Sequence, residues 1–145
     1  MSSPSLVPEL DVSSVSCSLR FYEEVLGFSV VYSRPDDGFV YLERKGTHLM
    51  IEQAAGPGRR FRTAPLVRPY GRGVNFQLAV SNAVWVRDRA ASLGYELVVD
   101  LEDRWYRTGQ AESGQRQVVV SDPDGYLWRP FQHLGERPVD PGLTP

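Results

Sequence analysis

The stretch LDVSSV at residues 10–15 returns as LAVSNA at residues 78–83, sixty-eight positions later. A second echo follows each copy, because VLGFSVV at residues 25–31 is matched by SLGYELV at residues 92–98. Both copies therefore read as a short strand, a capping Ser or Asn, an amphipathic helix, a glycine stop and more strand material. The sequence predicts two tandem copies of one β-α-β-β-β unit and an α+β fold class.

Each predicted helix has one apolar stripe at helical spacing. The stripe residues are Val15, Leu19, Tyr22 and Leu26 in the first copy and Ala83, Val86, Ala90 and Leu93 in the second. The N-terminal caps are expected at Ser13 or Ser14 and at Ser81 or Asn82. Gly27 and Gly94 are expected to end the helices in the left-handed conformation.

The strands that follow the helices are predicted at residues 29–33, 39–44 and 48–53 in the first copy and at residues 97–101, 104–107, 116–121 and 126–132 in the second. The turn sequences PDDG (35–38), KG (45–46) and DPDG (122–125) separate some of them. The chain is expected to form one domain over residues 1–145. Its parts are a first module at about 6–53, a connector at 54–72, a second module at about 73–134 and a tail at 135–145.

Composition restricts the class of protein. The net charge of −2 argues against a general nucleic-acid binder, which needs a basic surface. No apolar stretch has the length of a membrane span and no secretion signal is recognised, so a cytoplasmic protein is expected. The single cysteine, Cys17, cannot form an internal disulfide and is expected to be buried or half-buried.

Three motifs carry a family resemblance: VSSV at residues 12–15, SLRFY at 18–22 followed by VLGF at 25–28, and SDPDGY at 121–126. In this order and spacing the chain resembles the glyoxalase, bleomycin-resistance and extradiol-dioxygenase superfamily, the vicinal oxygen chelate proteins, over residues 6–134. VPEL at 7–10 and DGYLWR at 124–129 are most similar to its bleomycin-resistance branch. The resemblance implies that the two modules curl into a cup of mixed sheet with helices outside, and that the protein is a homodimer.

Metal-dependent members of this superfamily hold a divalent ion with one His or Glu from each of four strands. The resemblance places these ligand positions at Val7, Glu52, a residue near Asn75, and Arg129. Only Glu52 could bind a metal, and a guanidinium at Arg129 would repel one. No metal or other cofactor is therefore expected.

Strand alternation predicts which residues line the cup, because residues two apart face the same way. The predicted ligand-binding residues are Glu9, Asp11, His48, Met50, Glu52, Asn75, Gln77, Trp105, Tyr106, Arg129 and Phe131. Their polar groups could instead satisfy one another, with Arg129 paired to Glu52. Trp105 and Tyr106 could stack on a flat ligand or belong to the core, and the connector could be a lid or a plain linker.

The leading hypothesis is a metal-free protein without enzymatic activity that sequesters a bleomycin-type antibiotic or a similar planar ligand at the dimer interface. The carboxylates suit a cationic ligand, whereas the five arginines of the connector favour an anionic one if it folds over the cup. The alternative is a metal-dependent glyoxalase-like or dioxygenase-like enzyme. A third reading is a metal-free isomerase or hydrolase with Glu52 or Asp11 as general base.

Overall fold

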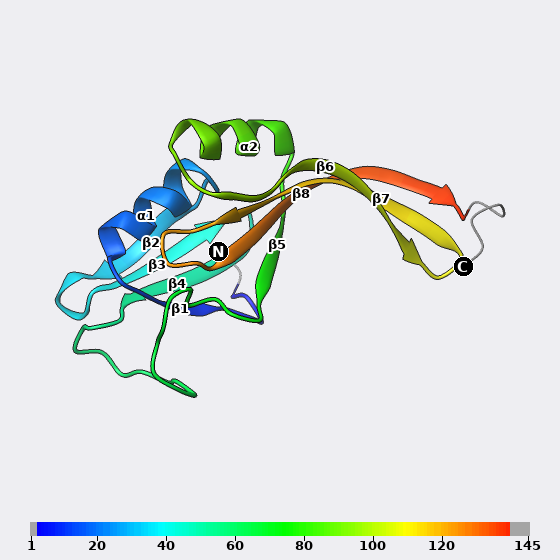
Figure 1. The fold of residues 1–145 in the computed structure, drawn as a ribbon. Helices are drawn as coiled ribbons and strands as arrows, with labels where there is room; N and C mark the ends of the chain where they lie inside the picture. Colours follow the sequence, from blue (N-terminus) through cyan, green and yellow to red (C-terminus); the bar gives the residue numbers. More distant parts are fainter. Residues whose placement is uncertain (1–2, 140–145) are drawn as a thin grey trace. The chain divides into compact units, whose positions relative to one another are not determined.

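A computed structural model describes residues 3–139 of the 145-residue chain. Two four-stranded sheets are present, with the strand orders β1-β4-β3-β2 and β5-β8-β7-β6, and each module contributes one α-helix (Figure 1). In each sheet the first two strands run parallel and the others antiparallel. This confirms the α+β class and the repeated β-α-β-β-β unit.

The residues group into two compact units. The first unit contains the chain up to Arg72 together with the turn Asp122–Gly125, and the second contains Gly73–Ser121 and the chain from Tyr126 onward. The connector therefore packs as part of the first unit. The DPDG turn does so too, although the strands on either side of it belong to the second.

The first unit follows its sequence prediction closely. Its elements are β1 (Glu9–Val12), α1 (Val15–Glu24), β2 (Ser29–Arg34), the short 3-10 helix η1 (Pro35–Asp37), β3 (Phe39–Arg44) and β4 (Thr47–Gln53). Phe21 and Tyr22 of α1 are fully buried with Val12, Leu42 and Ile51 of the sheet. One face of the sheet therefore forms the core with α1, which leaves the other face for polar groups.

Both helices begin with the same two devices. The Ser14 hydroxyl and the Asn82 side-chain oxygen accept hydrogen bonds from the amides of Cys17 and Trp85, at 3.3 and 3.0 Å. A glutamine from the last strand of each module accepts a hydrogen bond from the first amide of the helix. Gln53 accepts from Val15 of α1 and Gln132 accepts from Ala83 of α2, at 3.1 Å in both cases. The capping prediction is confirmed at Ser14 and Asn82. Cys17, however, is exposed and not buried.

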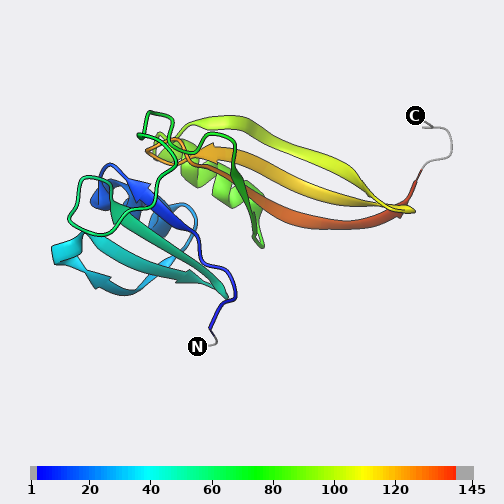
Figure 2. The same cartoon turned by 90° about the horizontal axis from the view of Figure 1, so that it is seen from below.

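The second unit differs from its sequence prediction in the length of its strands. Its elements are β5 (Asn75–Ala79), α2 (Ala83–Ser92), β6 (Leu97–Thr108), β7 (Ala111–Ser121) and β8 (Leu127–Pro138). The strands predicted at 97–101 and 104–107 are one strand, β7 begins before residue 116, and β8 continues into residues 135–138 of the predicted tail. Residues 140–145 of that tail lie outside the described residues. Figure 2 shows β6, β7 and β8 side by side well beyond the end of α2.

Cross-strand ion pairs explain why these polar segments are strands. Arg116 Nε of β7 lies 2.8 Å from Asp103 Oδ1 of β6, and Arg137 Nη2 of β8 lies 3.4 Å from Glu112 Oε2 of β7. Opposite charges on neighbouring strands favour pairing. Charged residues at 102–104 therefore continue the ladder and do not interrupt it.

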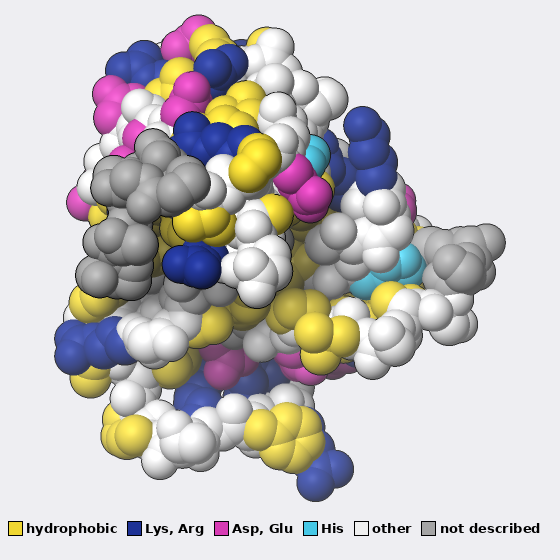
Figure 3. Space-filling view, turned by 90° about the vertical axis from the view of Figure 1, so that its right-hand side faces the viewer, with side chains coloured by type: hydrophobic (Ala, Val, Ile, Leu, Met, Phe, Trp, Pro, Cys, Tyr) yellow, Lys and Arg dark blue, Asp and Glu magenta, His cyan; other side chains and the backbone are white. Residues whose placement is uncertain are grey.

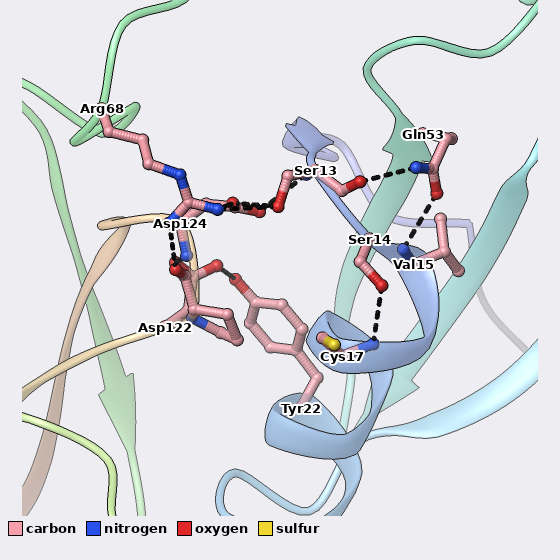
Figure 4. Close-up of polar contacts among 10 residues, drawn as sticks. Ser13, Ser14, Val15, Cys17, Tyr22, Gln53, Arg68, Asp122 and Asp124 are labelled. Atoms are coloured by element: carbon pink, nitrogen blue, oxygen red, sulfur yellow. Dashed lines mark hydrogen bonds and ion pairs between the residues drawn. The ribbon is translucent and has the colours of Figure 1, made fainter.

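The DPDG turn is held in the first unit by buried carboxylates (Figure 4). Asp124 Oδ2 accepts from the Ser13 amide at 2.9 Å, and Asp124 Oδ1 accepts from the Ser13 hydroxyl at 2.6 Å and from Arg68 Nη2 at 2.8 Å. The Tyr22 hydroxyl donates to Asp122 Oδ2 at 2.7 Å. The turn that joins β7 and β8 is thus tied to the start of α1 and to the connector.

Candidate functional site

The sheet of the first unit carries an acidic row, defined as Glu9 and Asp11 of β1 with Glu52 of β4. The register pairs Glu9 with Met50 and Asp11 with Glu52, and His48 lies two residues before Met50 on the same strand. All five side chains therefore share one face of the sheet, as predicted, while the alternate residues of these strands belong to the core.

The connector supplies cations to this acidic row. Arg60 Nη1 lies 2.7 Å from Glu52 Oε1, and Arg60 Nε lies 3.2 Å from Asp11 Oδ1. Arg62 Nε lies 2.8 Å from Asp11 Oδ2. The Arg60, Asp11 and Glu52 side chains are only 12%, 13% and 7% exposed, so these are partly buried ion pairs. Within the first unit Glu52 is thus paired with Arg60, a residue that the sequence did not distinguish from the other connector arginines.

Glu9 is the member of the row that forms no ion pair with an arginine among residues 3–139. Burial raises the pKa of Glu9 above its usual value, and a hydrogen bond with Glu52 and the negative charges of Glu52 and Asp11 raise it further, against the opposing effect of Arg60. A cavity of about 160 Å³ opens here, lined by Glu9, Asp11, Arg59, Arg60 and Phe61. Its lining mixes both signs of charge and is not the purely acidic surface that a cationic ligand would prefer.

Beside this row lies a group of aromatic rings that sequence analysis missed. Tyr32 of β2 stacks on Tyr41 of β3 with ring centroids 5.0 Å apart and planes 14° apart. The Tyr41 hydroxyl lies 2.7 Å from His48 Nδ1, and the Arg34 guanidinium lies 3.9 Å from the centre of the Phe39 ring. The strand register puts these side chains on the face of the acidic row. Because Tyr32 is 46% exposed, its ring offers a stacking surface for a flat molecule.

The sheet of the second unit has its own cavity. Gln77 pairs with Arg129 in the register of β5 and β8, and Tyr106 of β6 lies near them. The cavity measures about 240 Å³ and is lined by Gln77, Tyr106, Thr108, Ser113, Gln115 and Arg129. Three of the predicted binding residues, Gln77, Tyr106 and Arg129, are thus brought together. Asn75 and Phe131 share their sheet face but do not line the cavity.

A hydrogen-bond chain orients the Tyr106 hydroxyl in this cavity. Gln117 Nε2 donates to Tyr106 Oη at 2.7 Å and to Glu102 Oε1 at 3.2 Å. Arg129 Nη1 lies 3.5 Å from the same Tyr106 oxygen. Arg129 Nε and Gln115 Oε1 are buried and have no hydrogen-bond partner among residues 3–139. The cavity therefore contains polar atoms that the described part of the chain leaves unsatisfied.

Trp105, predicted together with Tyr106 as a ligand-stacking residue, lies outside this cavity. Neighbouring residues of a strand face opposite ways, so the two rings cannot both contact one ligand on one face. The Trp105 ring packs against Gly114, where an added Cβ would collide with it, and the Arg137 guanidinium lies 4.0 Å from the ring centre. Its contacts belong to the opposite face of the sheet.

The register also corrects one predicted metal-ligand position. The offset of sixty-eight residues maps the pair Glu9–Met50 onto Gln77–Arg129, and Asp11–Glu52 onto Ala79–Phe131. The counterpart of Arg129 in the first module is therefore Met50 and not Glu52. The four ligand positions then hold Val7, Met50, Asn75 and Arg129.

These four residues offer no carboxylate, imidazole or thiolate to a metal. Moreover, among residues 3–139 no three His, Cys, Asp or Glu side chains lie close enough together to hold one. The residues present do not fit the divalent ion of the metal-dependent members.

Figure 3 shows acidic and basic side chains interspersed over the face that it draws. The helices α1 and α2 have ten residues each, and no helix within residues 3–139 is long and apolar enough to cross a membrane. Each of the two cavities is a concave surface with a few polar lining residues, as small-molecule sites have.

Comparison with solved structures shows the same fold in two proteins of low sequence identity. TioX from Micromonospora sp. ML1 is 21% identical with a TM-score of 0.71, over 92% of this chain and 100% of that one. Virulence protein STM3117 from Salmonella typhimurium is 23% identical with a TM-score of 0.68, over 92% and 99% of the two chains. A glyoxalase/bleomycin resistance protein/dioxygenase superfamily member from Vibrio splendidus 12B01 is 34% identical over 87% and 95%, with a TM-score of 0.38.

No match was found among curated proteins. The family model described as Glyoxalase/Bleomycin resistance protein/Dioxygenase superfamily matches residues 9–129, which include both copies of the repeat and both cavities. The chain belongs to the glyoxalase/bleomycin resistance protein/dioxygenase superfamily.

Proposed function

We propose that this protein binds a planar small molecule without a metal and sequesters it, as the resemblance to bleomycin resistance proteins suggests. The observation that carries the proposal is the second unit's cavity, in which Arg129 occupies a metal-ligand position of the family. The other lining groups are neutral hydrogen-bonding side chains. Small-molecule sites combine such a concave surface with a few polar groups that fix orientation.

The first unit supports a flat ligand. The stacked rings of Tyr32 and Tyr41 present an aromatic surface, and the His48 bond to the Tyr41 hydroxyl holds the second ring in place. Offset stacking on such rings favours planar, unsaturated molecules. The family resemblance predicts that the polar faces of both sheets line one cup, which would give one ligand both kinds of contact.

The charge of the ligand follows from the arginines. Asp11 and Glu52, which would attract a cation, are already paired with Arg60 and Arg62. The family resemblance makes bleomycin-type antibiotics the first candidates, but they are cationic. Because the arginines already neutralise Asp11 and Glu52, a neutral or anionic planar ligand is favoured over them.

The proposal includes a homodimer. The terminal strands β2 and β6 both expose neighbouring valines, Val30 and Val31 in one and Val98 and Val99 in the other. Exposed edge strands with apolar side chains are usually covered, and two-fold pairing of identical chains is the commonest way to cover them.

The test is a thermal-shift screen of protein purified without chelator, against bleomycin and a panel of planar neutral and anionic metabolites. A ligand that binds only the folded state must raise the melting temperature. We expect hits among the planar compounds, no stoichiometric metal by elemental analysis, and a dimer by light scattering. Stoichiometric bound metal together with turnover of a glyoxalase or dioxygenase substrate would establish the alternative, a metal-dependent enzyme.

A further inference from the structure

We propose that the cavity of the second unit binds the carboxylate of a small organic acid, through Arg129 and Tyr106. This deepens the function proposed above and rests on it, because it names the chemical group of the ligand that this cavity recognises. All the residues concerned belong to the second unit.

Arg129 is a half-buried cation without a counter-charge. It forms no ion pair with any Asp or Glu among residues 3–139, whereas Arg116 and Arg137 of the same unit each have a carboxylate partner. Its one side-chain hydrogen bond, to Tyr106, is long at 3.5 Å, and its Nε is buried without a partner. A guanidinium with a buried N–H that has no partner destabilises a protein. An anion that accepts a hydrogen bond from this N–H removes the destabilisation, and this free energy contributes to its binding.

Tyr106 adds a second donor beside that guanidinium. Glu102 is acceptor-only when ionised, so the amide nitrogen of Gln117 must face it, and the same nitrogen then donates to the Tyr106 oxygen. The Tyr106 oxygen thus accepts from Gln117 and Arg129. Its own O–H is left to donate to a bound group.

The geometry and charge of these donors suit a carboxylate. A guanidinium edge binds the two oxygens of a carboxylate in parallel, and Tyr106 O–H can reach the same group. The remaining cavity residues, Gln77, Thr108, Ser113 and Gln115, carry no charge. The single positive charge of Arg129 therefore balances the charge of a monocarboxylate, but it balances only half of the charge of a dianionic phosphate.

The test uses benzoate and its neutral isostere benzamide as probes, with inorganic phosphate as a third. NMR titration of the Arg Nε–H resonances reports binding at Arg129 directly, even for weak ligands. We expect benzoate to shift the Arg129 signal and to bind roughly tenfold or more tightly than benzamide, since a charge-assisted hydrogen bond is worth about that factor. Phosphate is expected to bind more weakly than benzoate.

Two variants and one control make the test specific. Arg129→Gln is expected to abolish the preference for benzoate, and Tyr106→Phe to weaken benzoate binding while leaving benzamide binding nearly unchanged. Arg107→Gln is the matched control, because it removes the same charge from the neighbouring position on the opposite face of β6. Its benzoate affinity should equal that of the unaltered protein.

The outcomes separate this inference from the proposed function. Equal binding of benzoate and benzamide, tighter binding of phosphate, no response of Arg129 to benzoate, or unaltered benzoate binding in Arg129→Gln would each overturn the carboxylate site. If planar neutral compounds still stabilise the protein in that case, the proposed function stands without it. Bound metal with turnover would instead remove the proposed function, whatever the probes show at Arg129.

Discussion

The pairing of Arg60 with the acidic row makes a sharp prediction about stability. Replacing Arg60 by Gln removes the guanidinium that joins Glu52, at 2.7 Å, to Asp11, at 3.2 Å. Breaking a buried ion pair by removing one partner costs about 3–5 kcal/mol. Asp11 keeps a second partner in Arg62, so the substitution leaves mainly Glu52 without its partner. The loss of unfolding free energy should therefore lie near the lower limit, about 3 kcal/mol. That is a large part of the typical free energy of unfolding of a domain, about 5–15 kcal/mol.

Urea unfolding at neutral pH measures this loss, with Arg59→Gln as the matched control. Arg59 is exposed and its side chain contacts the Phe61 ring, 4.9 Å from the ring centre, so the control changes the net charge equally but breaks no buried pair. It should cost less than about 1 kcal/mol, the usual contribution of an exposed cation–π contact. Limited proteolysis within residues 54–72 should also become faster in Arg60→Gln, because the connector loses its anchor.

If Arg60→Gln and Arg59→Gln destabilise the protein equally, to within about 0.5 kcal/mol, the connector is not held by its ion pairs. The arginines would then no longer argue against a cationic ligand at the acidic row.

Sequence periodicity was sufficient for the fold of the first unit. Buried and polar residues alternate in LDV at 10–12 and in residues 48–53. Because successive side chains of a strand point to opposite faces of the sheet, this alternation predicted that the acidic row lies on the face opposite the core. The same alternation in β2 and β3 also contained the Tyr32–Tyr41 stack. The stack itself depends on the pairing of β2 with β3, which sets Tyr32 opposite Tyr41 and cannot be read from either strand alone.

The ion pairs of the connector could not be predicted in this way. Arg60 and Arg62 belong to a segment without regular structure, and five arginines in it could pair with any nearby acid. Which of them reaches Asp11 and Glu52 depends on the path of the backbone. Gly58 shows how closely that path is fixed, since a Cβ there would collide with the Glu52 carboxylate.

The second unit was harder because its strands are stabilised across the sheet. The charged residues Glu102 and Asp103 indicate a break when they are read along the chain, but Asp103 attracts Arg116 of the neighbouring strand. Cross-strand pairing also determines which residue of the first module is the counterpart of a given residue in the second. The resemblance placed the first-module counterpart of Arg129 at Glu52, whereas the observed pairing of Glu9 with Met50 and of Gln77 with Arg129 makes it Met50.

Two further substitutions test the ionised groups of the first unit. The raised pKa of Glu9 means that ionising Glu9 is harder in the folded state than in the unfolded state, so its contribution to stability is present at acid pH and is lost as pH rises through the raised pKa. Urea unfolding of Glu9→Gln from about pH 4 to about pH 7 should lack that fall, and an unchanged pH dependence would show that Glu9 is not the source. Asp124→Asn should be destabilising for a different reason. Its side chain is fully buried and accepts from the Ser13 amide at 2.9 Å and from the Ser13 hydroxyl at 2.6 Å, and an Asn offers one acceptor oxygen without charge in place of two. Losing one charged hydrogen bond costs about 1.5–3 kcal/mol, whereas the exposed control Asp36→Asn should stay within about 0.5 kcal/mol. Equal unfolding free energies for the two Asn variants would mean that the DPDG turn is not anchored at the start of α1.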